Sequence, residues 1–520
     1  MNNMGAMNKT DATNKYAWVV DQGDGTYKNP ILYTDYSDPD VIRTDRGFFM
    51  VASSFCNTPA IPLLHSMDLV NWKVVNYIVD TIPFPEYDRP RHGCGVWAPS
   101  IRHHAGRYYV FFPMPDEGIF MCSAKDPFGK WSDPVTVLAG KGWIDPCPFW
   151  DEDGKAYLVN GFAKSRCGFK SILRISPMKA DGTGLAGEGR DVFDGHDTQP
   201  TIEGPKLYKR NGWYYIFAPA GGVKAGWQTV LRSRDIYGPY EEKIVLLQGD
   251  TAVNGPHQGG WVTTQTGQDW FIHFQDVGNA GRIVHLQPMK WEKDWPVIGE
   301  DSGEGFGTPV LSWTKPEVGG TYPICAPEDS DAFDGERLGL QWQWNANYKK
   351  EWYSLSKEQK QLTLYSRHDE SPLCDVPNLL LQKWSAPSFA AAVKLHIDEL
   401  QPGDIAGMIS LGGVYTALAV EKTPKGRLLV QITGQWQKGE GKTVLAEIGS
   451  PVVIFKMVVE ADGRVSFLYG EDEARLEPVG ESVVMTPGRW VGVKDGLFIV
   501  NRSGESGGCL KADYYMLTEG

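Results

Sequence analysis

The chain has 520 residues, more than the roughly 250–300 at which a single hydrophobic core stops growing, so we expect two domains. Hydrophobic residues make up 42% and charged residues 22%, which excludes a disordered chain, and no apolar run reaches the ~18 residues of a membrane helix. The formal net charge of -13 argues against nucleic-acid binding, which depends on clustered lysine and arginine. The sequence therefore predicts a soluble globular protein with neither nucleic-acid nor membrane partners.

The first 15 residues are polar and contain no apolar segment typical of a secretory signal. We therefore expect a cytoplasmic protein, or an exported one from which a signal has been removed. The eight cysteines lie far apart and form no Cys-x-x-Cys pair. This spacing favours separate buried thiols over a zinc site or a disulfide framework.

A strand-turn-strand unit recurs five times in the first 320 residues. The turn of each unit contains a glycine, at Gly47, Gly106, Gly154, Gly212 and Gly267. Successive glycines are 59, 48, 58 and 55 residues apart, which is near the repeat length of propeller blades with longer loops. Two of the turns are Asp-Gly and Asn-Gly pairs, which favour tight hairpins. The repeat predicts a five-bladed β-propeller, with an ordinary β-sandwich as the alternative.

The repeat ends near residue 320, where prolines and an acidic run at residues 328–331 indicate a linker. Beyond it, apolar and polar residues alternate as in strands, for example at residues 428–432, and Asp462-Gly463 and Asp495-Gly496 predict hairpins. The whole chain is therefore predicted to be all-β, with a β-sandwich after the propeller. The predicted bounds are 1–25 for an N-terminal tail, 26–320 for the propeller, 321–332 for the linker and 333–520 for the sandwich.

Three acidic residues stand at the same position of different repeats. Asp38 and Asp145 each precede a proline, and Glu203 stands two residues before one. The innermost strand of a blade lines the central channel, so these carboxylates are expected to meet at one end of it. Hydrolysis of a glycosidic bond needs one carboxylic acid and one carboxylate, and a third acidic group raises the pKa of the acid. Each residue alone is typical of a turn, but their shared position favours a glycosidase site.

The segments around these residues resemble glycoside hydrolase family 43, the five-bladed β-xylosidases and α-L-arabinofuranosidases. The similar motifs are Asn-Pro-Ile-Leu at 29–32, Ser-Asp-Pro-Asp-Val at 37–41, Trp-Ile-Asp-Pro at 143–146, Glu-Gly-Pro-Lys-Leu-Tyr at 203–208 and Gly-Arg-Ile-Val-His-Leu-Gln-Pro at 281–288. The resemblance extends to about Pro309 and continues at residues 338–345, which are similar to the start of the family's concanavalin-like C-terminal domain. One departure is Cys147, where the family more usually has a small residue such as serine.

The resemblance implies an inverting mechanism in which Asp38 is the general base and Glu203 the general acid. It implies that Asp145 tunes the pKa of the acid and that Arg282 binds sugar hydroxyls near the cleaved bond. Inversion requires room for a water molecule between the base and the sugar, and sequence alone does not supply that geometry.

Aromatic side chains pack against the apolar faces of sugar rings. Phe55, Trp97 and Ala98 match family positions that wall the pocket of the terminal sugar. Trp227 is a further candidate, because its glycine-rich loop follows the blade of Glu203. Packing between blades is the alternative for each aromatic residue.

His257 opens the fifth repeat and is therefore expected to face the channel. The resemblance implies a structural Ca²⁺ ion at the channel centre, held mostly by water, with His257 beside it. Calcium prefers oxygen ligands, so a hydrogen-bonded channel histidine is the alternative. No organic cofactor is expected.

Together these features predict an exo-acting glycosidase that releases β-1,4-xylosyl or α-L-arabinofuranosyl units from xylo-oligosaccharides and arabinoxylan fragments. An endo-acting arabinanase or xylanase, which would need an open groove, and a non-catalytic carbohydrate-binding propeller are the alternatives. The sandwich is expected to close one side of the site, with residues 373–378 as the candidate loop that reaches its rim.

Overall fold

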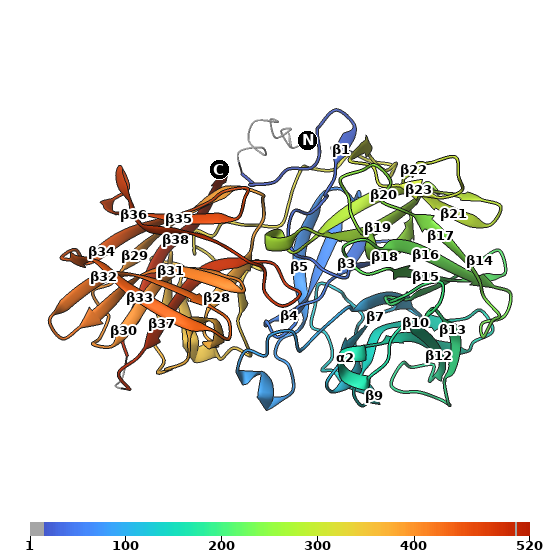
Figure 1. Cartoon of the computed structure of the whole chain (residues 1–520), viewed down its shortest axis with the longest axis horizontal. Helices are drawn as coiled ribbons and strands as arrows, with labels where there is room; N and C mark the ends of the chain where they lie inside the picture. Colours follow the sequence, from blue (N-terminus) through green and yellow to red (C-terminus); the bar gives the residue numbers. More distant parts are fainter. Residues whose placement is uncertain (1–14, 505–506, 520) are drawn as a thin grey trace, which may run out of the picture.

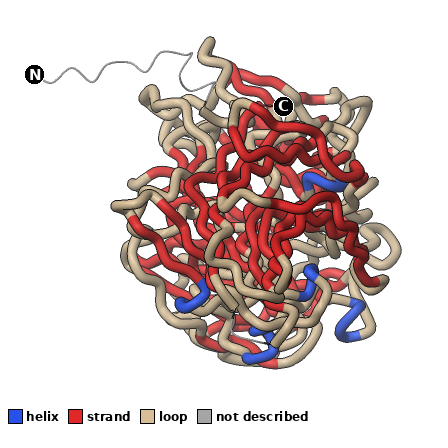
Figure 2. Tube along the Cα trace, turned by 90° about the vertical axis from the view of Figure 1, so that its left-hand side faces the viewer, coloured by secondary structure: helices blue, strands red, loops and turns tan. Residues whose placement is uncertain are grey.

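The computed structural model describes residues 15–504 and 507–519, which fold mainly into β-strands and connecting loops (Figures 1 and 2). Two all-β domains lie side by side, the first running from blue to yellow in Figure 1 and the second from orange to red. The predicted all-β fold is confirmed, and residues 1–14 of the predicted N-terminal tail lie outside the described ranges. Within those ranges, no helix has the length and apolar character needed to cross a membrane.

Five antiparallel sheets form the blades of the predicted propeller, and each has an inner strand and three that follow it outward. The first two blades contain β2 (Asp40–Thr44), β3 (Gly47–Val51), β4 (Ala60–Ser66), β5 (Trp72–Val79), and β6 (Ser100–His104), β7 (Arg107–Met114), β8 (Gly118–Ala124), β9 (Val135–Ala139). The third contains β10 (Trp143–Trp150), β11 (Ala156–Phe162), β12 (Ile172–Met178) and β13 (Arg190–Asp194). The last two contain β14 (Lys206–Arg210), β15 (Trp213–Ala220), β16 (Trp227–Ser233), β17 (Glu241–Leu246), and β18 (His257–Thr263), β19 (Asp269–Asp276), β20 (Arg282–Glu292), β21 (Trp295–Ile298).

The five turn glycines each join, or begin, the second strand of a blade, and all have a positive φ. Gly106, for example, has φ 73° between β6 and β7, a conformation that costs glycine little. The sequence repeat is therefore the blade repeat. Two short strands, β22 (Glu300–Asp301) and β23 (Gly307–Thr308), are added to the outer edge of the fourth blade. A separate two-stranded sheet is formed by β1 (Thr26–Lys28) and β24 (Ser312–Thr314).

The ring is closed by the segment that precedes the first blade. Asn29 donates its side-chain amide to the carbonyl oxygens of Leu286 and Val310, at 2.8 and 2.7 Å, and Leu32 pairs with Val284 of the fifth blade. A buried apolar cluster lies between each pair of neighbouring blades. The inner ends of the blades are therefore held in fixed positions around the channel.

The second domain is the predicted β-sandwich, built from two seven-stranded sheets. In sheet order, the first contains β25 (Gln343–Trp344), β28 (Leu380–Lys383), β37 (Lys494–Asn501), β30 (Asp404–Leu411), β31 (Val414–Thr423), β32 (Gly426–Gln435) and β33 (Gly439–Ile448). The second contains β26 (Tyr353–Ser356), β27 (Gln361–Tyr365), β38 (Cys509–Glu519), β29 (Phe389–His396), β34 (Val452–Val459), β35 (Arg464–Asp472) and β36 (Arg475–Val484). Large apolar side chains, including Trp344, Phe389 and Phe455, fill the space between the sheets.

One predicted hairpin is wrong. Asp462-Gly463 does join β34 to β35, but Asp495-Gly496 lies inside β37. A side chain at position 496 would meet the backbone oxygen of Leu380 at 1.9 Å, so this glycine permits close approach of strands and makes no turn. Asp495 is fully buried there and accepts a hydrogen bond from the hydroxyl of Tyr515.

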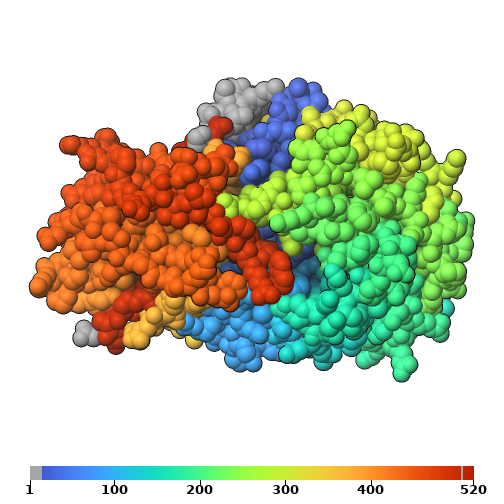
Figure 3. Space-filling model, viewed as in Figure 1, coloured from blue at the N-terminus to red at the C-terminus, as the bar shows by residue number. Residues whose placement is uncertain are grey.

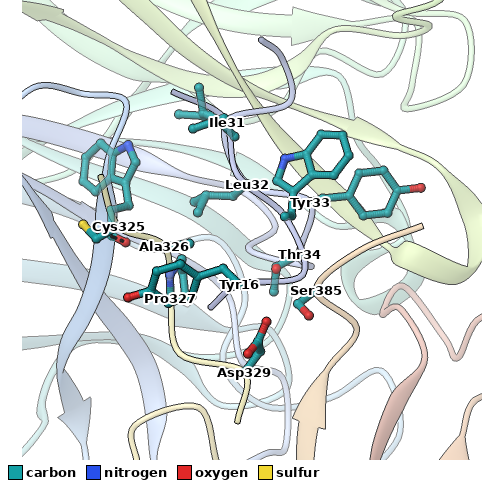
Figure 4. A pocket seen from close by; sticks show the side chains of 13 residues that line it. Tyr16, Ile31, Leu32, Tyr33, Thr34, Cys325, Ala326, Pro327, Asp329 and Ser385 are labelled. Carbon is teal, nitrogen blue, oxygen red and sulfur yellow. Dashed lines mark hydrogen bonds between the residues drawn. The ribbon is translucent and has the colours of Figure 1, made fainter. Parts of the chain in front are cut away.

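The domains are joined by backbone pairing and by the linker. Thr58 and Trp344 exchange backbone hydrogen bonds of 2.6 and 3.2 Å, and Asp331, near the end of the predicted linker, pairs with Tyr515 of β38. A cavity of about 20 Å³, large enough for about one water molecule, lies where the N-terminal residues, the first blade and the linker meet (Figure 4). Asp329 lines this cavity and accepts a hydrogen bond from the Ala17 amide at 3.0 Å.

Candidate active site

The three carboxylates singled out by the sequence line one cavity at the end of the propeller channel. This cavity has a volume of about 260 Å³, and its lining includes Asp38, Asp145 and Glu203. Asp38 precedes β2, Asp145 lies in β10, and Glu203 precedes β14, so each comes from the inner edge of a different blade. The structure thus brings together residues that are 107 and 58 positions apart in the chain.

The backbone at these positions has an uncommon conformation. Asp38 and Asp145 have φ values of 56° and 54°, in the left-handed region that non-glycine residues seldom adopt, and Gly204 beside Glu203 has φ 60°. Strained backbone of this kind persists only where the surrounding structure enforces it, and it is concentrated at functional sites. Asp38 and Asp145 therefore share a backbone conformation, whereas at the third position the positive φ belongs to Gly204, which adopts it at little cost.

Asp38 is held by three donors. The hydroxyls of Ser37 and Ser53 lie 3.0 and 2.6 Å from its Oδ2, and Nη1 of Arg282 lies 3.0 Å from its Oδ1. The Arg282 guanidinium is stacked over Phe274 at 4.8 Å and is almost completely enclosed. Asp38 is therefore a fixed acceptor beside a cation, with the same cation lining the cavity.

Asp145 is as deeply buried as Asp38, with 4% of the residue exposed against 5%. It accepts a hydrogen bond from the Gly204 amide at 2.8 Å, which ties it to the segment of Glu203. Burial, and secondarily the charge of Glu203, raise the pKa of Asp145 to about 7. Lys206, fully buried and bonded to the Ser100 hydroxyl at 2.9 Å, acts weakly in the opposite direction. Asp145 and Glu203 therefore form a pair that keeps one proton to near neutral pH.

Glu203 is the most solvent-accessible of the three carboxylates, with 35% of its side chain exposed. Its Oε1 lies 2.9 Å from Nε2 of His257, the first residue of β18. His257 therefore faces the channel as expected, but its side chain contacts the carboxylate of Glu203.

The histidine, cysteine and carboxylate side chains described around His257 do not by themselves form a calcium site. Nδ1 of His257 is buried without a hydrogen-bond partner, so one ring nitrogen is available. However, residues 15–504 and 507–519 contain no group of three or more histidine, cysteine, aspartate or glutamate side chains arranged to hold a metal ion. Calcium binds through several oxygen ligands, which these side chains do not supply.

The expected aromatic walls are partly in place. Phe55, Trp97 and Ala98 line the cavity, and the rings of Phe55 and Trp97 lie 6.3 Å apart. Trp227 is not among the lining residues. Its indole nitrogen donates to Gln199 at 2.8 Å and its ring packs between the third and fourth blades, so the alternative of blade packing is correct for Trp227.

A loop of the sandwich, residues 486–493 between β36 and β37, completes the cavity wall. Trp490 of this loop lines the cavity, and its ring meets that of Trp97 edge-on at 4.9 Å. Figure 3 shows a red segment of the second domain reaching across to the hollow in the first. The loop predicted for this role, residues 373–378, lies elsewhere: Asp375 contacts His92, 3.2 Å away, outside the cavity lining. No local signal in the sequence distinguishes Trp490 from the other tryptophans.

All eight cysteines are free thiols, as the sequence predicts, and Cys147 is buried in β10, two residues after Asp145. Its sulfur is 2.9 Å from Nη2 of Arg102, which also binds Asp40. The departure from the family pattern at this position leaves Asp145 in the cavity.

Comparison with known proteins shows which family the chain belongs to. The profile of glycosyl hydrolases family 43 matches residues 27–296, and that of the beta xylosidase C-terminal concanavalin A-like domain matches residues 330–517. The chain belongs to glycosyl hydrolase family 43. This family 43 chain is therefore a glycosidase with a five-bladed catalytic propeller and a concanavalin-like second domain.

Relatives match the family 43 chain over nearly its whole length. An inferred beta-xylosidase of Xylanibacter ruminicola is 41% identical, over 92% of this chain and 86% of its own. A beta-xylosidase of Formosa agariphila is 31% identical, over 95% of this chain and 90% of its own. A family 43 protein of Bacillus licheniformis has the same fold, with a TM-score of 0.84 at 24% identity, over 95% of this chain and all of that one.

Proposed function

We propose that the protein is an exo-acting, inverting glycosidase that releases β-1,4-xylosyl or α-L-arabinofuranosyl units from xylo-oligosaccharides and arabinoxylan fragments. The observation that carries this proposal is the cavity in which three carboxylates from different blades face aromatic rings, with a sandwich loop across one side. Xylopyranose and arabinofuranose present similar hydroxyl patterns to such a cavity. The names of the relatives from Xylanibacter and Formosa support the xylosyl assignment.

In the proposed reaction Glu203 donates its proton to the glycosidic oxygen as the bond to the anomeric carbon breaks. Asp38 takes a proton from the water that attacks the opposite face of the sugar, so both carboxyl groups return to their starting state when a proton is transferred back through solvent. The pair of Asp145 and Glu203 holds one proton to near neutral pH, because repulsion between the two carboxyl groups opposes a second negative charge on the pair, and this proton is then available for donation. Arg282, beside Asp38, is placed to bind hydroxyls of the same sugar.

Product analysis with aryl β-xyloside, aryl α-L-arabinofuranoside and xylo-oligosaccharides tests the proposal. We expect Glu203→Ala and Asp38→Ala each to lower kcat by about 10²–10⁴-fold on substrates with poor leaving groups. Glu203→Ala is expected to recover on activated aryl glycosides, which need no protonation, and Asp38→Ala is not. The control is Glu152→Ala, a carboxylate in the third blade whose side chain is 88% exposed. Full activity of both cavity variants would refute the assignment.

A structural Ca²⁺ ion in the channel stays a proposal, for an ion held mainly by water beside His257. It predicts that chelator treatment lowers Tm and that added Ca²⁺ restores it. An unchanged Tm, measured by calorimetry before and after chelation, would exclude the ion.

A further inference from the structure

A second cavity adjoins the catalytic one at the seam between the domains. Its volume is about 590 Å³, and its lining includes Lys224, Asn254 and Asp276 of the propeller and Trp490 of the sandwich. Trp490 and Arg282 line both cavities, so the two share a boundary. The second cavity is therefore placed to receive the part of a substrate that extends beyond the sugar being released.

Three lysines that line these two cavities, and an arginine beside Trp490, have no acidic partner among the described residues. Lys164, the first residue of the short helix α2 (Lys164–Cys167), and Lys170, which follows this helix, line the catalytic cavity, and Lys224 lines the second. The guanidinium of Arg489 lies 4.8 Å from the ring centre of Trp490. In the part of the chain that the structure describes, the salt bridges include none of these four residues.

Other cations near the cavity do have partners. Arg166 lies 3.3 Å from Asp116, and Arg282 lies 3.0 Å from Asp38. Asp276 lines the second cavity, and its carboxylate lies 4.0 Å from Nε of Arg282, so it forms an ion pair with that residue. The two linings together contain four basic side chains, Lys164, Lys170, Lys224 and Arg282, and four acidic ones, Asp38, Asp145, Glu203 and Asp276. The three lysines are the basic residues of these linings for which the described residues supply no acidic partner.

Neutral pentoses carry no charge that could pair with Lys164, Lys170 or Lys224. At physiological ionic strength the Debye length is about 8 Å, so unpaired lysines at the rim of a concave site act on a charge entering that site and little beyond it. An anionic group on a substrate that spans the two cavities would find Lys164 and Lys170 in the lining of the first and Lys224 in that of the second. A sugar carboxylate is the anionic group that an oligosaccharide can carry without losing its fit to a sugar site.

We propose that the lysines lining the two cavities recognise a uronic-acid substituent on the leaving-group side of the substrate, so that acidic oligosaccharides are preferred over neutral ones of equal length. This inference rests on the proposed glycosidase function, whose sugar pocket it extends. It assigns Lys164, Lys170 and Lys224 to binding of the substituent, with Arg489 as a further contributor.

Binding to the Glu203→Gln variant, measured by calorimetry, tests the inference apart from catalysis. The ligands are a xylo-oligosaccharide with one glucuronic acid on a non-terminal xylose and the unsubstituted oligosaccharide of the same length. We expect tighter binding of the acidic ligand, and loss of this preference at ~1 M salt, where the Debye length is about 3 Å. Equal affinities at low salt, or a preference that survives high salt, would overturn the inference.

Substitution of the lysines supplies the residue-level test. In the same background, Lys164→Gln, Lys170→Gln and Lys224→Gln should each lower the affinity ratio of acidic to neutral ligand by roughly twofold to fivefold, as for exposed ion pairs. The matched control is Lys425→Gln, an exposed lysine in the hairpin between β31 and β32, which should leave the ratio unchanged. A ratio unaffected in the triple lysine variant, with Tm unchanged, would refute the assignment.

The ratio of kcat/KM for the two ligands on the wild-type protein separates the two proposals. Release of pentose from both ligands with equal kcat/KM and equal binding would refute the charge preference and leave the glycosidase function standing. Preferential binding of the acidic ligand without release of pentose from either would refute the proposed function, and the charge preference would stand as a binding property.

Discussion

Asp145 serves the proposed reaction from a position where burial opposes its ionisation. Its carboxylate is buried, carries a left-handed backbone and lies next to the segment of Glu203, so its ionisation is opposed by both desolvation and like charge. The same proximity that raises the pKa of Asp145 also holds a proton on the pair. The residue is therefore expected to lower stability while serving the reaction.

Asp145→Asn separates these two effects. The substitution removes the carboxyl group whose pKa is about 7 from the coupled pair, so the alkaline limb of the kcat/KM profile should move to lower pH and kcat should fall by about 10²-fold or more. The folded-state pKa of about 7 lies above the ordinary value of 3.8, so wild-type stability decreases as pH rises through this window. The variant should therefore gain stability relative to wild type at pH 8 but not at pH 4.

The control for this prediction is Asp151→Asn. Asp151 is a buried carboxylate of the same blade, and its oxygens accept hydrogen bonds from Nζ of Lys209 and the hydroxyl of Tyr214, both at 2.5 Å. Its loss removes a structural ion pair, so it should lower stability at neutral pH without moving the alkaline limb. An unshifted limb in Asp145→Asn would contradict the role assigned to Asp145.

At the scale of single elements, the sandwich loop of residues 486–493 contributes one wall of the cavity at the end of the propeller channel. Trp490 has φ 64° and projects onto Trp97 and the guanidinium of Arg166, which lies 5.9 Å from its ring. Under the proposed function this ring would pack against the sugar beyond the cleaved bond. The loop makes the second domain part of the cavity wall.

Trp490→Ala should lower kcat/KM on xylo-oligosaccharides by roughly fivefold, since an aromatic contact is worth about 1 kcal/mol beyond its buried area. The loss should be smaller on aryl glycosides with short leaving groups. Trp313→Ala is the control, because Trp313 of β24 is similarly exposed, at 39% against 37%, and lines neither cavity. Equal losses in the two variants would show that Trp490 has no specific contact with substrate.

The elements that could be predicted from sequence are those with a local signature. The turn glycines predict the blades, and a proline or glycine next to Asp38, Asp145 and Glu203 marks their shared position, because both depend on backbone conformation at one place in the chain. Trp490 has no such signature, since its role arises from contact between residues about 390 positions apart. Asp495-Gly496 shows the opposite error, where a turn dipeptide serves strand packing.

Over the whole molecule, one carboxylate links the domains to the site. Asp35, buried between them, accepts hydrogen bonds from the amide of Arg282 and from the amide of Gly492, both at 2.9 Å. The backbones approach so closely that a Cβ at Gly492 would lie 2.8 Å from the Gly281 nitrogen. Arg282 is therefore positioned by the sandwich through Asp35 as well as by its own blade.

Gly492→Ala tests this coupling, because the added methyl group must push the sandwich loop away from Gly281. We expect a loss of about 1–3 kcal/mol in the free energy of unfolding, as for overpacked sites. We also expect a fall of roughly tenfold to a hundredfold in kcat/KM, since Arg282 and Trp490 would both be displaced. Gly449→Ala in the same domain is the matched control, because a Cβ there meets no atom within 4 Å. Lower stability with full activity would show that the domain contact is structural and does not position Arg282.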